Sequence, residues 1–166
     1  CSFTVTVVDN QLPTITCPAN ISVNAGSGLC TAVVTYTAPV GADNCAGAST
    51  TQSAGLASGA TYPVGTTTNT YRVTDASGNS ATCSFTVTVV DNQVPTILCP
   101  ANISLNASVG ACATIVSYST PVGSDNCTGS TTTQTAGMAG GASFPVGTTT
   151  NTFLVTDAFG NTATCS

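Results

Sequence analysis

The residues able to do chemistry in this chain are six aspartates and nine cysteines, because the sequence has no histidine, glutamate, lysine or tryptophan. The aspartates occupy three positions of a repeating pattern, and each has an asparagine close by. Carboxylate and amide oxygens are the ligands that Ca²⁺ prefers. The predicted calcium ligands are Asp9, Asn10, Asp43, Asn44, Asp75 and Asn79 in the first copy, and Asp91, Asn92, Asp125, Asn126, Asp157 and Asn161 in the second.

The reason to expect a cation is electrostatic. Three carboxylates in each copy have no countercharge, and in a seven-strand sandwich Asp9, Asp43 and Asp75 can fall at one pole, the pole that faces the preceding domain. Carboxylates gathered in this way repel one another unless a cation lies among them. The alternative is that Asp and Asn only form Asx turns, with residues 75–79 as a hairpin turn.

Composition excludes several classes of function. Arg72 is the only basic residue and charged residues make up 4% of the chain, so a phosphate backbone cannot be neutralised and nucleic-acid binding is excluded. The apolar runs are too short to span a bilayer, and no basic patch could bind an anionic membrane. Without His, Glu or Lys, most acid–base and nucleophilic arrangements cannot be assembled, so we expect no enzyme activity.

The chain is built from two copies of one unit. Residues 1–82 and 83–164 align without a gap, and 57 of 82 positions are identical. This period is too long for a solenoid repeat and fits an independently folding β-domain. The phase of the repeat predicts residues 1–8 as the last strand of a preceding repeat, residues 9–90 as the first repeat, and residues 91–166 as a second repeat that lacks its last strand.

Each copy has the pattern of an all-β domain. Residues 2–8 alternate Phe and Val with Thr, the period of a half-buried strand. Turn-forming clusters at 24–28, 39–44 and 75–79 separate further candidate strands, which cover 14–24, 30–37, 49–54, 60–64, 67–74 and 80–90. About seven short strands in each copy predict tandem immunoglobulin-like or fibronectin-like β-sandwiches.

The cysteines are interpreted as structural staples from an oxidising compartment. Four cysteines in each copy allow three pairings. The first and last strands of such a sandwich run parallel and Cys17 and Cys83 open them, which predicts Cys17–Cys83 and Cys99–Cys165. The remaining pairs would be Cys30–Cys45 and Cys112–Cys127, unless Cys30 starts a strand at the opposite end of the sandwich from Cys45.

Covalent glycans are also expected, because a sugar coat would keep a chain of so little charge in solution. The N-x-Ser/Thr pattern for N-glycosylation occurs at Asn20, Asn102, Asn106 and Asn126.

The sequence resembles the hyalin repeat (HYR) domain family over its whole length. Four segments carry the resemblance, and nearly all of them recur one period later: residues 8–21 (VDNQLPTITCPANI), residues 43–45 (DNC), residues 62–66 (YPVGT), and residues 74–79 (TDASGN) leading into 83–89 (CSFTVTV). This resemblance implies an immunoglobulin-like sandwich found in tandem in extracellular proteins tied to cell adhesion. It brings no catalytic residues.

We therefore expect a structural repeat segment of a secreted extracellular fibre or adhesin stalk, located outside the cell or on its surface, with Ca²⁺ stiffening the domain junctions. Its expected partners are copies of itself or neighbouring repeats of the same chain. The alternative is a ligand- or glycan-binding module of a larger secreted protein. Against that alternative, the chain has no Trp, and its Tyr and Phe residues occupy core-like positions apart from Phe159.

The two ends of the sequence predict how the second repeat is completed. A sandwich without its last strand would expose a long apolar edge. We expect the polypeptide to continue beyond Ser166 with a Phe-Thr-Val-like strand, and Cys1, the equivalent of Cys83, to have its partner in a preceding repeat. The alternative is that the Ser2–Val8 strand of a neighbouring chain fills the gap.

Overall fold

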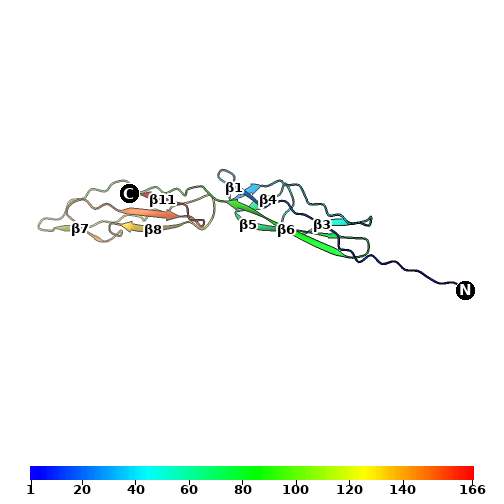
Figure 1. Ribbon diagram of the computed structural model, residues 1–166. Coiled ribbons are helices and arrows are strands. Elements are labelled where there is room, and N and C mark those ends of the chain that lie inside the picture. Colours follow the sequence, from blue (N-terminus) through cyan, green and yellow to red (C-terminus); the bar gives the residue numbers. More distant parts are fainter. The chain divides into compact units, whose positions relative to one another are not determined.

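The computed structural model describes residues 1–166 and is entirely β, which confirms the predicted fold class (Figure 1). Its contacts divide the chain into two compact units: residues 1–26 and 30–90 form the first, and residues 27–29 and 91–166 form the second. No segment of the structure is a helix with the length and apolar character needed to cross a membrane.

The first unit has two small sheets. Its strands are β1 (Ile21–Asn24), β2 (Thr31–Val33), β3 (Ser49–Ala54), β4 (Thr61–Pro63), β5 (Gly65–Thr74) and β6 (Ser80–Val90). The larger sheet has the order β1-β6-β5-β3, and β2 pairs with β4 in the smaller one. As expected for this kind of sandwich, the first strand β1 runs parallel to the last strand β6, with Ile21 opposite Val87.

Strand β6 supplies much of the core of the first unit. Its alternating pattern turns Phe85, Val87 and Val89 inward, and each is at most 3% exposed. They pack with Val34 and with Tyr62 of β4, so the two sheets share one core. Burying these side chains is the main source of stability in a domain of this size.

A hydrogen-bonded network lies within this core. Asn69 is 0% exposed; its side-chain carbonyl accepts the backbone N–H of Leu56 at 2.8 Å and its side-chain N–H donates to the Tyr62 hydroxyl at 3.1 Å. The hydroxyls of Tyr62 and Tyr36 both donate to the Leu56 carbonyl. The pKa of Tyr36 is raised mainly because its hydroxyl is desolvated, and the hydrogen bond with the Tyr71 hydroxyl raises it further. The sequence does not indicate this network, because Asn69 lies within a predicted strand and its hydrogen-bond partners come from distant parts of the chain.

The second unit repeats the fold with fewer strands. It contains β7 (Ala113–Ile115), β8 (Thr131–Ala136), β9 (Ser143–Pro145), β10 (Thr152–Thr156) and β11 (Thr162–Cys165), in sheets of order β11-β10-β8 and β7-β9. Strand β11 corresponds to residues 80–83 of β6, and the second unit has a cleft of about 1020 Å³ lined by residues that include Phe153 and Ser166. Residues 103–106, the equivalents of β1, form no strand there. This follows from the sheet order, because β1 pairs only with β6 in the first unit.

Residues 1–8 form no strand, although their alternation predicts one, and they extend away from the sheets of the first unit (Figure 1). The reason is physical: a strand needs a neighbour to pair its backbone groups. The apolar side chains of this segment are accordingly exposed, Phe3 to 89% and Val7 to 93%.

Two of the four predicted disulfides are present. Cys17 bonds to Cys83 and Cys99 to Cys165, each with Cα atoms 5.6 Å apart. In the first unit, the parallel pairing of β1 with β6 brings Cys17 and Cys83 together, as the sequence predicts.

The predicted pairs Cys30–Cys45 and Cys112–Cys127 are wrong, since Cys45 and Cys112 are free thiols whereas Cys30 and Cys127 are disulfide-bonded. In the first unit, Cys30 lies next to β2, near the Val90 end of β6, where Ala25 donates to the Val90 carbonyl. Cys45 lies with the loops at the Ser80 end. The 11 residues of β6 separate these ends by about 35 Å, far beyond the roughly 7 Å Cα separation that a disulfide spans.

Candidate metal centre

The acidic pole of the first unit is the end where Asp9, Asp43 and Asp75 lie, and the hairpin turn between β5 and β6 anchors it. The Oδ1 atom of Asp75 accepts the backbone N–H groups of Ser77 and Asn79 at 2.9 and 2.8 Å, and its Oδ2 accepts the Asn79 side-chain N–H at 2.8 Å. Burial alone would raise the pKa of Asp75, but these hydrogen bonds outweigh it and the pKa is lowered. The Asx-turn alternative is therefore correct for Asp75.

Asn79 links this turn to the segment that enters the unit. Its side-chain N–H also donates to the backbone carbonyl of Asp9 at 3.2 Å. The Asp9 Oδ1 accepts the backbone N–H of Gln11 at 3.0 Å, which fixes the carboxylate relative to its own backbone. Asp75 and Asn79 thus hold the backbone of Asp9 in place.

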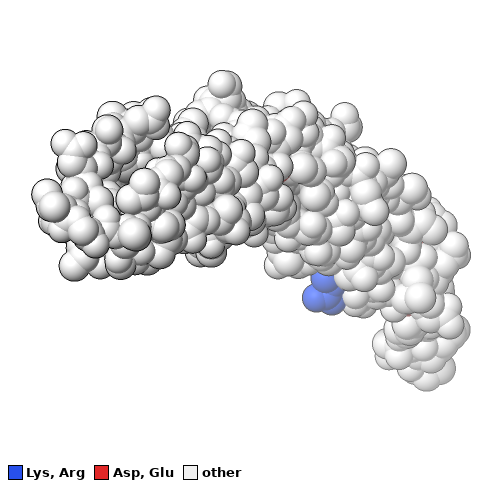
Figure 2. All heavy atoms as spheres, turned by 90° about the vertical axis from the view of Figure 1, so that its left-hand side faces the viewer, with Lys and Arg blue, Asp and Glu red and all other residues white.

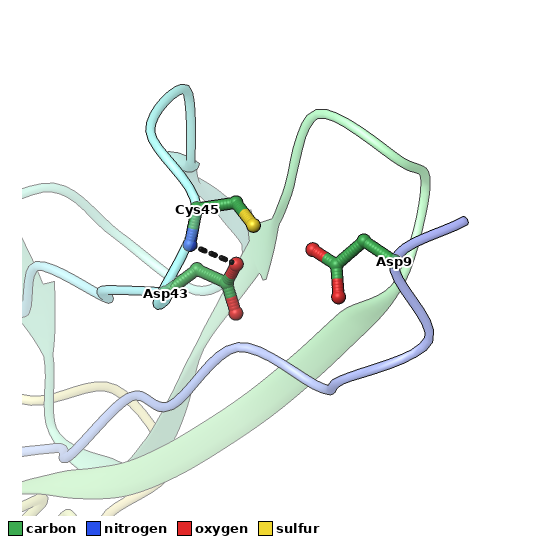
Figure 3. A group of neighbouring side chains, drawn as sticks. All are labelled: Asp9, Asp43 and Cys45. Atoms are coloured by element: carbon green, nitrogen blue, oxygen red, sulfur yellow. Dashed lines mark hydrogen bonds between the residues drawn. The ribbon is translucent and has the colours of Figure 1, made fainter. Parts of the chain in front are cut away.

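Asp9 and Asp43 converge on one point, as Figure 3 shows, and Cys45 joins them. One ligand atom from each of these three residues lies within 4.8 Å of the other two. Asp43 is oriented by its own loop, because its Oδ2 accepts the backbone N–H of Cys45 at 3.0 Å. The sequence predicts both aspartates at one pole but a disulfide for Cys45. The run Asp43-Asn44-Cys45 is the pattern that could have indicated Cys45 as a member of this cluster.

One carboxylate oxygen in this cluster has no partner. The Oδ2 atom of Asp9 is buried and accepts no hydrogen bond, and the equivalent Oδ2 of Asp91 in the second unit is in the same situation. Asp91 is only 5% exposed. Leaving a charged oxygen buried and unpaired is costly, so each of these atoms marks a place where a cation would be favourable.

The asparagines of the predicted ligand set differ in their positions. Asn44 follows Asp43 in the chain. When the Asn44 side-chain amide is oriented with its nitrogen toward Asp43, that nitrogen lies 3.2 Å from Oδ1 and 3.1 Å from Oδ2 of the carboxylate. In the opposite orientation the Asn44 carbonyl oxygen faces the same point and adds to the oxygen cluster. Asn10 and Asn92 are exposed neighbours of the buried aspartates.

The Cys45 thiol keeps its proton in this setting. Interaction of the protonated thiol with the Asp9 carboxylate, followed by the repulsion between that carboxylate and a thiolate, raises the pKa of Cys45. A soft metal such as Zn²⁺ prefers a thiolate ligand, whereas a hard cation is satisfied by oxygens. The cluster is therefore better matched to a hard cation.

The second unit repeats this geometry. Ligand atoms of Asp91, Asp125 and Cys127 lie within 4.8 Å of one another, and Asp125 Oδ2 accepts the Cys127 N–H at 2.9 Å. Asn161 donates to the Asp91 carbonyl at 3.2 Å and to Asp157 at 2.7 Å. Because Cys127 is disulfide-bonded, only oxygens can serve as ligands in the second unit.

All six carboxylates are at least partly buried. Figure 2 accordingly shows a surface that is almost entirely uncharged, with one blue side chain on the face in view. The only basic residue, Arg72, is exposed on β5 and donates to Ser80. The net charge of −5 is thus concentrated at the acidic poles, which can hold a metal ion.

The glycosylation candidates are accessible to different degrees. Asn20, Asn102 and Asn106 are exposed, whereas Asn126 is half-buried. The Asn20 carbonyl oxygen accepts the Thr86 N–H at 2.8 Å. A glycan on the Asn20 nitrogen is compatible with that bond, because the bond uses the oxygen.

Comparison with known proteins identifies the family to which this fold belongs. The family model of the HYR domain matches residues 8–89 and 90–166. The chain belongs to the HYR domain family and consists of two tandem HYR domains, which are immunoglobulin-like β-sandwiches.

The relatives of the chain are larger proteins. Hyalin of Strongylocentrotus purpuratus is 40% identical over 166 residues, which cover 97% of this chain and 14% of that protein. Hyalin of Lytechinus variegatus is 35% identical, with 99% of this chain and 32% of that protein covered. A Mus musculus protein with sushi, von Willebrand factor type A, EGF and pentraxin domains is 32% identical, with 95% and 4% covered. The chain thus spans less than a third of each of these relatives.

Together with the disulfides, the similarity to hyalin indicates an extracellular protein. Membership of the HYR family indicates a structural module without catalytic function.

Proposed function

We propose that this chain is a structural repeat segment of a secreted fibre or adhesin stalk, in which each unit binds one Ca²⁺ at its acidic pole. Similar units, each with a disulfide that joins its entering segment (Cys17 or Cys99) to its last strand (Cys83 of β6 or Cys165 of β11), suit a protein that must resist extension. The observation that carries the calcium assignment is the buried, unpartnered Oδ2 atom, which recurs at Asp9 and Asp91.

The ligands of each site come from two segments of the chain. In the second unit, Asp91 follows directly on the last residue of β6 of the first, and Asp125 belongs to a loop within the second unit. A cation shared by Asp91 and Asp125 would fasten the segment that leaves one unit to the body of the next. Bound Ca²⁺ would thereby restrict bending of the chain at this segment, with further oxygens from the asparagines, backbone carbonyls and water.

Calorimetric titration with CaCl₂ tests the calcium sites. We expect two ions per 166-residue chain with a Kd on the order of 10⁻⁴–10⁻³ M, the range of extracellular calcium modules. Asp125→Asn keeps the shape of the side chain and should reduce the stoichiometry from two to one, which leaves the first unit as an internal control. MgCl₂ should give weaker heats, because Mg²⁺ needs a stricter octahedral geometry. Unchanged titrations in the variant would refute the assignment.

A mechanical measurement tests the structural role. The chain is stretched between its ends in a single-molecule instrument, in Ca²⁺ and in chelator. We expect Ca²⁺ to raise the unfolding force and the two disulfides to limit the extension of each unit. A glycan array is the complementary test, since selective binding to one sugar class would favour the ligand-binding alternative.

A further inference from the structure

Residues Ser27–Leu29 belong to the second unit, although they come from the first half of the sequence. All three are exposed, and they form a tight turn, which we call the bridging turn. The backbone φ of Gly28 is +70°, a conformation that L side chains rarely adopt, and a Cβ atom at this position would meet no other atom within 4 Å. The bridging turn therefore needs Gly28 for its backbone conformation and not for space.

Two hydrogen bonds connect the bridging turn to the rest of the second unit. The Gly28 backbone N–H donates to the Gln93 side-chain oxygen Oε1 at 2.7 Å. The Asn126 side-chain N–H donates to the Leu29 backbone carbonyl at 3.0 Å. The turn thus uses one backbone donor and one backbone acceptor to bind side chains from two separate segments of the second unit.

These two side chains are neighbours of the proposed calcium ligands. Gln93 lies two positions after Asp91, and its backbone N–H donates to the Asp91 Oδ1 at 3.1 Å. Asn126 directly follows Asp125. Ligand atoms of Asp91 and Asp125 lie within 4.8 Å of each other. The bridging turn is therefore bonded to both of the segments that carry the converging carboxylates.

The approach of the two carboxylates is unfavourable until a cation binds, because like charges at this distance repel each other. The penalty is increased at Asp91, which is 5% exposed and whose Oδ2 accepts no hydrogen bond. The hydrogen bonds of the bridging turn oppose the separation of the two segments. They therefore preorganise the carboxylates for an ion, which reduces the free-energy cost of assembling the site when the ion binds.

We propose that the bridging turn positions Asp91 and Asp125 for Ca²⁺, and that bound Ca²⁺ in turn stabilises the hydrogen bonds of the bridging turn. The inference rests on the proposed calcium site of the second unit and specifies what sets its affinity. The two effects must be equal, because a coupling free energy acts in both directions. Since the Asn126 nitrogen binds Leu29, the Asn126 amide oxygen remains available as a ligand for the ion.

Calorimetric titration with CaCl₂ tests the effect of the turn on the ion. All variants carry Asp43→Asn, which removes a ligand of the first site so that the heats report the second. Gln93→Ala deletes the acceptor of the Gly28 N–H, and we expect the Kd to rise about fivefold, the effect of one hydrogen bond. Ser27→Ala is the control and should leave the Kd unchanged, because the exposed Ser27 side chain makes neither bond. An unchanged Kd in Gln93→Ala would overturn the inference.

Hydrogen exchange at the Gly28 amide tests the effect of the ion on the turn, because this N–H is the donor to Gln93. In the wild-type chain, saturating CaCl₂ should slow this exchange about fivefold, the same factor as the change in Kd. In Gln93→Ala, CaCl₂ should leave it unchanged. A purely structural role of Gln93 would lower protection throughout the second unit and would not make the Gly28 amide respond to Ca²⁺, so a wild-type amide without that response contradicts the inference.

A substitution at the other end of the same hydrogen bond gives an independent test. Gly28→Ala strains the bridging turn without a steric clash and should weaken Ca²⁺ binding at the second site. Gly110→Ala is the matched control, because Gly110 has a φ of +81° and equally open surroundings but lies in a different turn, at residues 108–111. Gly28→Ala and Gln93→Ala break one bond, so their combined effect on the Kd should be less than additive. Equal effects of the two glycine substitutions would exclude the bridging turn as the cause.

These measurements separate the inference from the proposed function. A chain that binds no Ca²⁺ refutes both. A second site that binds Ca²⁺ with the same Kd in the wild-type chain and in Gln93→Ala refutes the role of the bridging turn alone and leaves the calcium assignment unaffected.

Discussion

The side-chain amide of Asn79 donates a hydrogen bond at 3.2 Å to the backbone carbonyl of Asp9, which lies 70 positions earlier in the chain. The same amide nitrogen donates to Asp75 at 2.8 Å. One asparagine thus ties the segment entering the unit to the hairpin turn between its last two strands. Asn161 forms the same bridge to Asp91 in the second unit, so this connection is a repeated structural element.

Replacing this bridge should loosen the calcium site without removing a ligand. Asn161→Ala deletes the bonds to Asp91 and Asp157, and we expect a loss of about 1–2 kcal/mol in the stability of the second unit. The Ca²⁺ affinity of the second unit should fall because Asp91 is no longer held in position. Calorimetry measures the Ca²⁺ affinity. Hydrogen exchange, followed separately in each unit, shows whether the loss of stability is confined to the second unit. Equal losses in both units would contradict this assignment.

Acid should destabilise the fold through Asp75 and Asp157. Their pKa values are lowered in the folded protein, because the hydrogen bonds from their turns outweigh desolvation. The stabilisation is therefore fully present above the unfolded carboxyl pKa of about 3.9 and is lost as the pH falls through the lower folded pKa. Urea unfolding between pH 7 and pH 2 should show this decline. In the double variant Asp75→Asn, Asp157→Asn the decline should be smaller.

The disulfide between the segment that precedes β1 and the last strand β6 should account for a large share of the stability of the first unit. Cys17 and Cys83 are 66 positions apart, and closing a loop of that length stabilises by about 4 kcal/mol on the chain-entropy model. Replacing both with Ala should cost this amount in urea unfolding of the first unit. Cys45→Ala is the control, because Cys45 is an exposed free thiol, and it should change stability by no more than about 0.5 kcal/mol.

The reactivity of Cys45 should report on its acidic neighbours. Asp9 raises the pKa of this thiol, so the fraction of reactive thiolate at pH 8 is small. We expect iodoacetamide to modify Cys45 more slowly than the exposed Cys112, as measured by peptide mass spectrometry. Asp9→Asn should accelerate the reaction. Added Ca²⁺ should also accelerate it if the ion lies at this pole, because a cation favours the thiolate.

The hydroxyl of Tyr62 should stabilise the first unit specifically. It bonds to the Leu56 carbonyl and accepts the Asn69 side chain at 3.1 Å. Tyr62→Phe leaves the buried side-chain N–H of Asn69 without this acceptor, whereas the Leu56 carbonyl keeps the hydrogen bond from Tyr36, and the change should cost about 1–3 kcal/mol. The second unit already has Phe144 at this position, so the reverse change Phe144→Tyr is the control and should not destabilise by a comparable amount. Chemical unfolding followed by hydrogen exchange distinguishes the two units.

The sequence alone determined the features that depend on local pattern and on the repeat. The alternation of Phe85, Val87 and Val89 identifies the inward face of β6, since successive side chains of a strand point to opposite sides. The 82-residue period defines the two units. The Cys17–Cys83 bond was also predictable, because it requires only that the first and last strands run parallel.

Tertiary structure decided which loops meet and which atoms remain unsatisfied. The Cys30–Cys45 pairing failed because the two cysteines lie near opposite ends of β6, and spacing along the chain does not report the end at which a loop emerges. Asp75 and Asp9 look alike in sequence, yet the turn around Asp75 saturates its carboxylate and the packing around Asp9 leaves one oxygen bare. Hydrogen-bond satisfaction depends on groups far apart in the chain, so only the folded arrangement reveals it.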